Sequence, residues 1–208
     1  MHGALRARMR DAGLAWCAVA LALLIGSLLA FAFKTDALIE WQPALAATQP
    51  WRWWSAAFVH YSALHLVGNL AGLSLTAAFG WVSQVPLRAA IAWFIAWPLT
   101  QLGLLCMPGL LHYGGLSGVV HAGVAIVIGY VLITGTRGQR AVVVTVMVGL
   151  VTKIATETPW REPVQHPAGW DIGIAPIAHV TGVLAGVLCL LLAQAWHAGQ
   201  QRKKRRHA

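Results

Sequence analysis

Six long apolar segments constrain the fold of this chain more than any other feature. They cover residues 14–33, 63–80, 87–106, 116–133, 141–155 and 174–196. A helix of about 20 residues crosses the roughly 30 Å of hydrocarbon in a bilayer. Backbone groups in lipid must bond within their own segment, and the sequence lacks the alternating strands of a membrane barrel. The sequence therefore predicts an all-α, polytopic membrane protein with six transmembrane helices in one bundle.

The composition agrees with a membrane domain that fills most of the chain. Of the 208 residues, 58% are hydrophobic and 10% are charged, whereas soluble domains carry about 25% charged residues. This balance argues against a soluble core. We expect a basic amino-terminal segment at residues 1–13, one membrane domain at residues 14–196, and a basic tail at residues 197–208.

The basic residues predict how the helices cross the membrane. Four of the fifteen Lys and Arg residues fall on one side, namely Lys34, Arg52, Lys153 and Arg161. The other eleven fall on the opposite side, namely Arg6, Arg8, Arg10, Arg88, Arg137, Arg140 and residues 202–206. Cytoplasmic segments carry the excess of Lys and Arg, so both termini are predicted to be cytoplasmic. The basic tail is expected to contact anionic membrane lipids and not nucleic acid.

Two other features of the sequence have simple interpretations. Basic residues before the first span, with Ala30, Phe31 and Ala32 near its end, resemble a cleaved signal peptide. The run is longer than a usual signal segment, and its removal would leave five spans, so we expect it to stay. The three cysteines, Cys17, Cys106 and Cys189, are scattered and predict no disulfide framework. No cofactor or metal is expected.

Four polar residues lie within the predicted spans, where such side chains are costly and tend to be functional. His65 and Asn69 occur near the start of the second span, Ser117 opens the fourth, and His179 enters the sixth. Spans two, four and six run in the same direction through the membrane. All four residues are therefore predicted to lie at one depth, as a single site built from three helices requires.

These residue types fit acyl transfer by a serine nucleophile. His179 is the candidate base for Ser117. His65 and Asn69 share a helix face at i, i+4, and with the Ser117 amide they are candidates for an oxyanion hole. The six acidic residues include none on the sixth span, so we expect a Ser–His dyad without a carboxylate. A lone Ser or His in a membrane helix is usually a packing residue; their joint occurrence favours a site.

Small residues predict close contact between the fourth and sixth spans. Gly182 and Gly186 follow His179 on one helix face, and Gly118 and Ala122 offer a matching strip. Gly115 is assigned to helix packing as well. Such a contact would bring Ser117 to His179.

The motifs HLVGN, GLSG and AHVTGVLAG resemble HxxxN, GxSG and AHxxGxxxG of the rhomboid intramembrane proteases, in the same order. Trp51 and Arg52 resemble the WR element of that family, and the resemblance covers roughly residues 50 to 190. It implies a six-helix serine protease with Ser117 as nucleophile, His179 as base, and His65 and Asn69 at the oxyanion. GxSG differs from the GxSxG nucleophile elbow, because Val119 holds the last position.

His121 departs from the Tyr that many rhomboids carry four residues after the Ser. GLSGVVHA resembles the rhombosortase branch of small bacterial proteins. That resemblance implies an inner-membrane enzyme whose site opens to the outer face. Its substrates would be exported proteins with a carboxy-terminal tail of Gly-Gly, a membrane helix and basic residues. General rhomboid proteolysis of other substrates stays open, as do orienting and packing roles for His121.

The fifth span ends in Lys153 and Glu157, which are expected to form a local pair or a snorkelling surface set. Residues 158–173 predict an interfacial loop that covers the site. Three alternative functions remain: a non-catalytic rhomboid-like protein that binds membrane helices, a transporter, and a haem or metal protein. The last would use five histidines: His60, His65, His112, His121 and His179.

Overall fold

The computed structural model describes residues 2–206, with side chains from residue 13 onward. Over these residues the chain is helical, with two isolated β-bridges between loop residues. The α-helices are α1 (His2–Phe33), α2 (Asp36–Ile39), α3 (Arg52–Ser55), α4 (Ala63–Val82), α5 (Leu87–Gly103), α6 (Ser117–Thr134), α7 (Arg137–Thr156) and α8 (Ile177–Arg206). Short 3-10 turns lie at Pro43–Leu45, Ala56–Phe58 and Leu104–Cys106.

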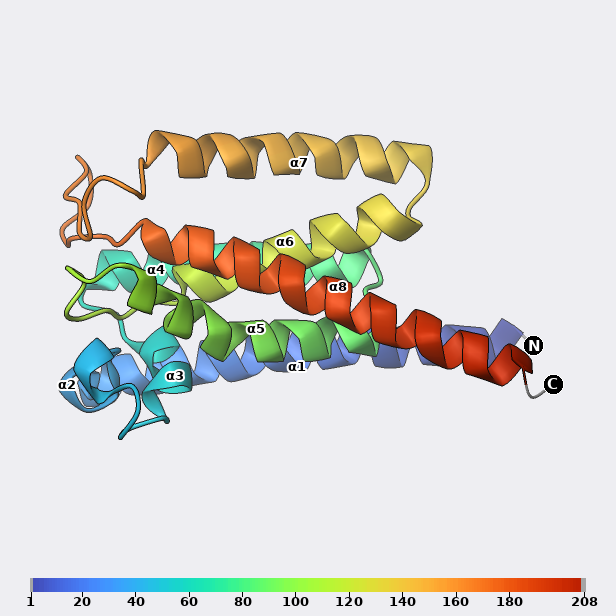
Figure 1. Cartoon of the computed structure of the whole chain (residues 1–208), viewed down its shortest axis with the longest axis horizontal. Coiled ribbons are helices and arrows are strands. Elements are labelled where there is room, and N and C mark those ends of the chain that lie inside the picture. The colour runs from blue at the N-terminus through green and yellow to red at the C-terminus, as the bar shows by residue number, and fades with distance from the viewer. Residues whose placement is uncertain (1, 207–208) are drawn as a thin grey trace.

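Within residues 2–206, six helices are long and apolar enough to cross a membrane: α1, α4, α5 with its 3-10 extension, α6, α7 and α8. The predicted all-α membrane bundle is therefore confirmed. Figure 1 shows these helices lying along the long axis of the molecule. The helices α2 and α3 and the longer loops gather at one end, which we call the loop end. Both described chain ends lie at the other, which we call the terminal end.

The helices α6 and α8 approach so closely that their backbones touch. A Cβ built on Gly182 would overlap the backbone of Gly118, and one on Gly186 would lie 2.5 Å from the carbonyl oxygen of Ala122. Only small residues permit such an approach between membrane helices. On its other side α8 packs against α5, where the Thr181 hydroxyl donates to the carbonyl of Thr100 at 3.0 Å.

The fifth span begins earlier than the apolar pattern predicted. It starts at Arg137 instead of near residue 141, because Thr136 and Gln139 form a capping box. The Thr136 side chain accepts from the Gln139 amide, and the Gln139 side chain accepts from the Thr136 amide. These bonds satisfy backbone donors that a helix start leaves open.

The sixth span begins later and ends later than predicted. Ile174 exchanges two backbone hydrogen bonds of 2.8 Å with Gln165, so the chain enters α8 only at Ile177. The helix then runs to Arg206, and residues 197–206 of the predicted tail continue it. Residues 207–208 lie outside the described residues, as do residue 1 and the side chains of Arg6, Arg8 and Arg10.

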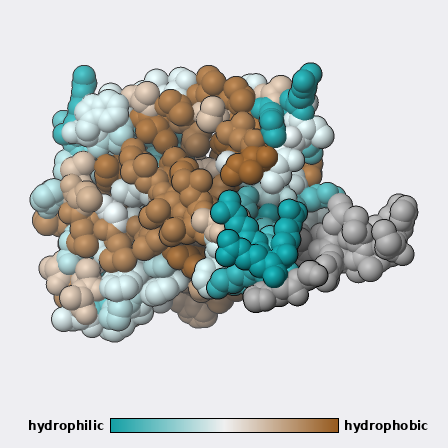
Figure 2. Space-filling model, turned by 45° about the vertical axis from the view of Figure 1, so that its right-hand side comes forward, coloured by the Kyte–Doolittle hydropathy of each residue, from teal (hydrophilic) through white to brown (hydrophobic). Residues whose placement is uncertain are grey.

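The surface of the bundle is that of a multi-pass membrane protein. Figure 2 shows apolar side chains forming a broad band across one face, with polar residues toward its ends. Large side chains such as Leu75, Val151 and Leu192 are 60% or more exposed. Exposed apolar surface on this scale fits contact with lipid tails.

A buried arginine organises the loop end. Arg52 is 5% exposed and donates to the carbonyl of Glu40 at 2.6 Å and to the Gln49 side chain at 2.6 Å. It also reaches the carbonyl of Ala37. The guanidinium therefore ties α3 to the segment after α1, which gives the Arg of the Trp51-Arg52 pair a structural task.

Candidate active site

Ser117 and His179 meet at the loop end, where α6 and α8 begin. The Oγ atom of Ser117 lies 3.0 Å from Nε2 of His179. Ser117 is the first residue of α6 and His179 is the third of α8, so the close crossing of these helices joins residues far apart in sequence. A serine hydroxyl beside an imidazole nitrogen is the geometry of a nucleophile and its base.

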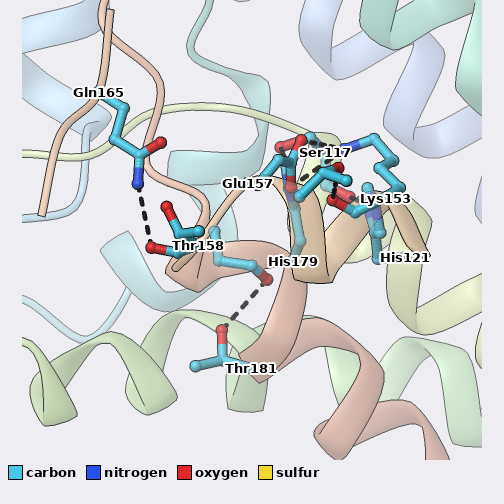
Figure 3. Close-up of polar contacts among 10 residues, drawn as sticks. Ser117, His121, Lys153, Glu157, Thr158, Gln165, His179 and Thr181 are labelled. Atoms are coloured by element: carbon cyan, nitrogen blue, oxygen red, sulfur yellow. Dashed lines mark hydrogen bonds and ion pairs between the residues drawn. The ribbon is translucent and has the colours of Figure 1, made fainter. Parts of the chain in front are cut away.

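A carboxylate also contacts His179, which corrects the expectation from sequence. Oε2 of Glu157 lies 2.6 Å from Nδ1 of His179 (Figure 3), so the expected dyad without a carboxylate is wrong as a description of the site. Glu157 comes from the end of α7, and the loop that follows folds back to α8. When Nδ1–H donates to Glu157, Nε2 is free to accept the hydroxyl hydrogen of Ser117.

Lys153 lies one turn before Glu157 and pairs with it. Its ammonium donates to Oε1 of Glu157, which confirms the expected local pair, and it lies 3.3 Å from Nδ1 of His179. Burial acts to raise the pKa of the Glu157 carboxyl. The hydrogen bonds from His179 and Lys153, together with their charges, outweigh burial and lower that pKa to about 2. Glu157 is therefore ionised at neutral pH.

His121 packs directly on the ring of His179. The two ring centroids are 4.1 Å apart and the planes differ by 14°. Nδ1 of His121 lies 2.7 Å from the carbonyl oxygen of Ser117, one helical turn earlier. This contact fixes the His121 ring, which packs flat against the ring of His179.

His65 and Asn69 lie on the first two turns of α4 and line the same cavity as Ser117. Nδ1 of His65 and Nδ2 of Asn69 are buried, and within the described part of the chain neither has a hydrogen-bond partner. A buried polar atom left unpaired costs roughly 1–3 kcal/mol. The amide of Ser117 is also unpaired within its helix, as first-turn amides are. Polar groups gathered in this way suit a negatively charged oxygen.

Gly115 does not serve helix packing, contrary to the expectation from sequence. It precedes α6 and has a φ of +150°, in the region that favours glycine. A Cβ at this position would lie 3.1 Å from Nε2 of His65. Gly115 instead lets the turn before Ser117 approach the His65 ring, and the Tyr113 hydroxyl donates to its carbonyl at 3.0 Å.

A cavity of about 310 Å³ opens beside Ser117 and is lined by α4, α6, α7 and the loop before α8. Within that loop, Trp170 lies edge-on to His65 with ring centroids 6.5 Å apart. The Ser62 hydroxyl donates to Asp171 at 2.7 Å, which ties the loop to the start of α4. The loop before α8 therefore forms part of the cavity wall at the loop end of the bundle.

The five histidines considered as haem or metal ligands do not form one cluster. His121 stacks on His179, as described above. His112 pairs with Glu40 at 2.7 Å, and His60 lies against His65 with ring centroids 4.9 Å apart. In the part of the chain that the structure describes, no group of three His, Cys, Asp or Glu side chains is placed to hold a metal ion.

Fold and site together define a multi-pass membrane protein with a serine and a histidine in contact inside its bundle. Residues 47–195 match the Rhomboid domain family. The chain is 33% identical over 149 residues to proteins named Rhomboid protease GlpG from Yersinia pestis (strain Pestoides F) and Yersinia pseudotuberculosis serotype O:3 (strain YPIII). The identity to the protein of that name from Yersinia enterocolitica serotype O:8 / biotype 1B is also 33%, over 150 residues.

This chain therefore belongs to the rhomboid family. Each of these matches covers 67% of the chain and 47% of the relative, so the chain spans about half the length of the curated relatives it matches.

Proposed function

We propose that this protein is an intramembrane serine endopeptidase with Ser117 as nucleophile and His179 as base. The observation that carries the proposal is the 3.0 Å contact between Ser117 Oγ and His179 Nε2 at the edge of a cavity. His65 and Asn69 line the same cavity, and this supports the proposal because peptide cleavage requires polar groups that stabilise an oxyanion. Membership of a family with members named as proteases supports it further.

In the proposed reaction, Ser117 Oγ bonds to the carbonyl carbon of the scissile peptide while its proton passes to Nε2 of His179. The carbonyl oxygen becomes negative and is held by the Ser117 amide, His65 and Asn69. His179 then gives the proton to the departing amine as the C–N bond breaks. Water then attacks the resulting ester and gives a proton to His179. His179 passes this proton to Ser117 Oγ as the ester C–O bond breaks, which releases the new carboxyl end and restores the serine hydroxyl.

The site lies at the loop end, which carries the smaller share of basic residues. By the positive-inside rule, both termini then lie in the cytoplasm and the site lies toward the outer face of the bacterial inner membrane. A substrate helix must unwind there to present its backbone to Ser117. Glycine residues ease unwinding by roughly 1 kcal/mol each.

The substrates proposed for this site are exported proteins with a tail of Gly-Gly, a membrane helix and basic residues. His121 within GLSGVVHA supports this rhombosortase assignment, and its stack on His179 gives the residue a place in the site. General rhomboid proteolysis of other membrane proteins is the alternative.

Purified protein in detergent is expected to form a single adduct with a fluorophosphonate probe. Ser117 Oγ would displace fluoride from phosphorus while its proton passes to His179. Intact mass and peptide mapping check the number and position of adducts. Ser117→Ala is expected to give none, and Ser74→Ala, at an exposed serine on α4, is expected to label fully. A folded protein that forms no adduct would favour a non-catalytic protein that binds membrane helices.

A membrane-anchored reporter that ends in Gly-Gly, an apolar helix and basic residues is expected to be cleaved near the Gly-Gly pair. Replacement of the Gly-Gly pair by Leu-Leu is expected to slow cleavage at least about tenfold, because two glycines weaken a helix by roughly 2 kcal/mol. Product mass and initial rate are the measurements. A reporter with Gly-Gly moved to the other end of its helix controls for composition. Equal rates for all three reporters would support general rhomboid proteolysis instead.

A further inference from the structure

Packing holds α7 in the bundle less than it holds the other spans. Along α7 as described, one residue is buried, Val143 at 2% exposure. In the most apolar stretch of α7 only 6% of the residues are buried, against 44% for the corresponding stretch of α8 and 61% for that of α6. Figure 1 shows α7 as the outermost helix on one side of the bundle. Since membrane helices associate largely through packing, α7 is the span most easily displaced.

The loop end of α7 nevertheless contacts the active site. Among the described residues, its polar contacts to α8 are those of Lys153 and the capping residue Glu157, and both are made to His179 (Figure 3). Thr158 follows with a φ of +43°, a conformation that β-branched residues seldom adopt. This turn ends the helix so that the Glu157 carboxylate stays at the imidazole.

We propose that Glu157 positions His179 for proton transfer, and that docking of α7 against α8 delivers it, so the base is correctly oriented only while α7 is docked. The inference rests on the proposed serine chemistry, and it adds that the docking of α7 governs this chemistry. A carboxylate on Nδ1 keeps the tautomer that leaves Nε2 free, and it stabilises the imidazolium formed when Ser117 loses its proton. Hydrogen bonds to charged groups are among the strongest polar contacts in proteins, which matters for a helix with little buried surface.

The groups around His179 fit this positioning role. Lys153 and Glu157 face the ring from α7, and His121 and Ser117 face it from α6. Lys153 occupies the second carboxylate oxygen of Glu157, which leaves Oε2 for Nδ1. The pair adds little net charge beside the ring, so Glu157 contributes direction without fixing His179 in its protonated form.

Glu157→Gln is expected to lower the limiting rate of fluorophosphonate labelling at Ser117 at least about tenfold, with little change in the probe concentration that gives half the rate. Glu157→Asp is expected to retain more of the rate than Glu157→Gln, because it keeps the charge. Glu162→Gln, at an exposed loop carboxylate, is the matched control. Parental rates in Glu157→Gln would overturn the positioning role.

The delivery by α7 is tested at Val143, which lies fourteen residues before Glu157, or about 21 Å along a helix. Val143→Ala removes buried contact between α7 and the bundle and is expected to slow labelling several-fold. In the Glu157→Gln background it is expected to have no further effect, although independent changes this far apart normally add. Val142→Ala, at a position 61% exposed, is the control. An unchanged rate in Val143→Ala, or additive losses, would refute control by docking.

The labelling of the parental protein separates this inference from the proposed function. If the parental protein forms no adduct at Ser117, the serine chemistry itself fails. If Ser117 labels normally while the Glu157 and Val143 variants match the parent, only the positioning by α7 fails.

Discussion

His179→Ala is expected to slow cleavage of a membrane-embedded reporter at least about 1000-fold, since loss of a serine protease base has an effect of this size or larger. Nε2 of His179 is placed 3.0 Å from Ser117 Oγ, and no other histidine described contacts that oxygen by hydrogen bonding. The remaining activity is expected to rise with pH, because hydroxide then takes over removal of the hydroxyl proton.

Initial rates of reporter cleavage, measured from acidic to alkaline pH, check this expectation. His197→Ala is the matched control, because His197 lies on the same helix and is exposed far from the site. A parental rate of reporter cleavage in His179→Ala would show that Ser117 is activated by another group, or that cleavage does not proceed through Ser117.

Gly182→Val is expected to destabilise the fold more than any single exposed change, by about 3 kcal/mol. A side chain at Gly182 meets the backbone of Gly118, which cannot rotate away as a flexible side chain would. The two helices would have to separate, and with them Ser117 and His179. A loss of this size lowers the midpoint of thermal unfolding by roughly 10 °C in a chain of this length.

Thermal unfolding in detergent, followed by circular dichroism, is the measurement for Gly182→Val. Gly149→Val on α7 is the control, because a Cβ there meets nothing within 4 Å. It is expected to leave the midpoint nearly unchanged. Equal midpoints for the two variants would mean that α6 and α8 do not cross as closely as described.

The fold was largely predictable because lipid leaves few alternatives. Uninterrupted apolar runs must be helices, and their lengths gave six spans that the structure confirms. The ends were harder to predict, because local hydrogen bonds decide them. The capping box of Thr136 and Gln139 starts α7 early, and the bridge from Ile174 to Gln165 delays α8. Such bonds depend on backbone turns, which hydropathy does not report.

The site was predictable where it depends on motifs and not where it depends on loop geometry. Ser117 and His179 follow from two helices that small residues bring together. Glu157 was missed as a partner of His179, because it lies on a different helix and reaches the ring only through the turn at Thr158. A rare acidic residue at a span end, beside Lys153, was the available signal. Gly115 was misassigned because sequence does not reveal its φ.

The helix α8 runs without a break from the site to the terminal end of the bundle. His179 and Arg202 lie on one helix, 23 residues and about 35 Å apart, close to the roughly 30 Å of hydrocarbon. The basic residues that follow favour the anionic headgroup layer and anchor that end. Under the proposed orientation, the fixed length of α8 then determines how far below the outer surface of the membrane His179 lies. A thicker bilayer would draw the site away from water, and hydrophobic mismatch would thereby select which peptide bond of a substrate is within reach.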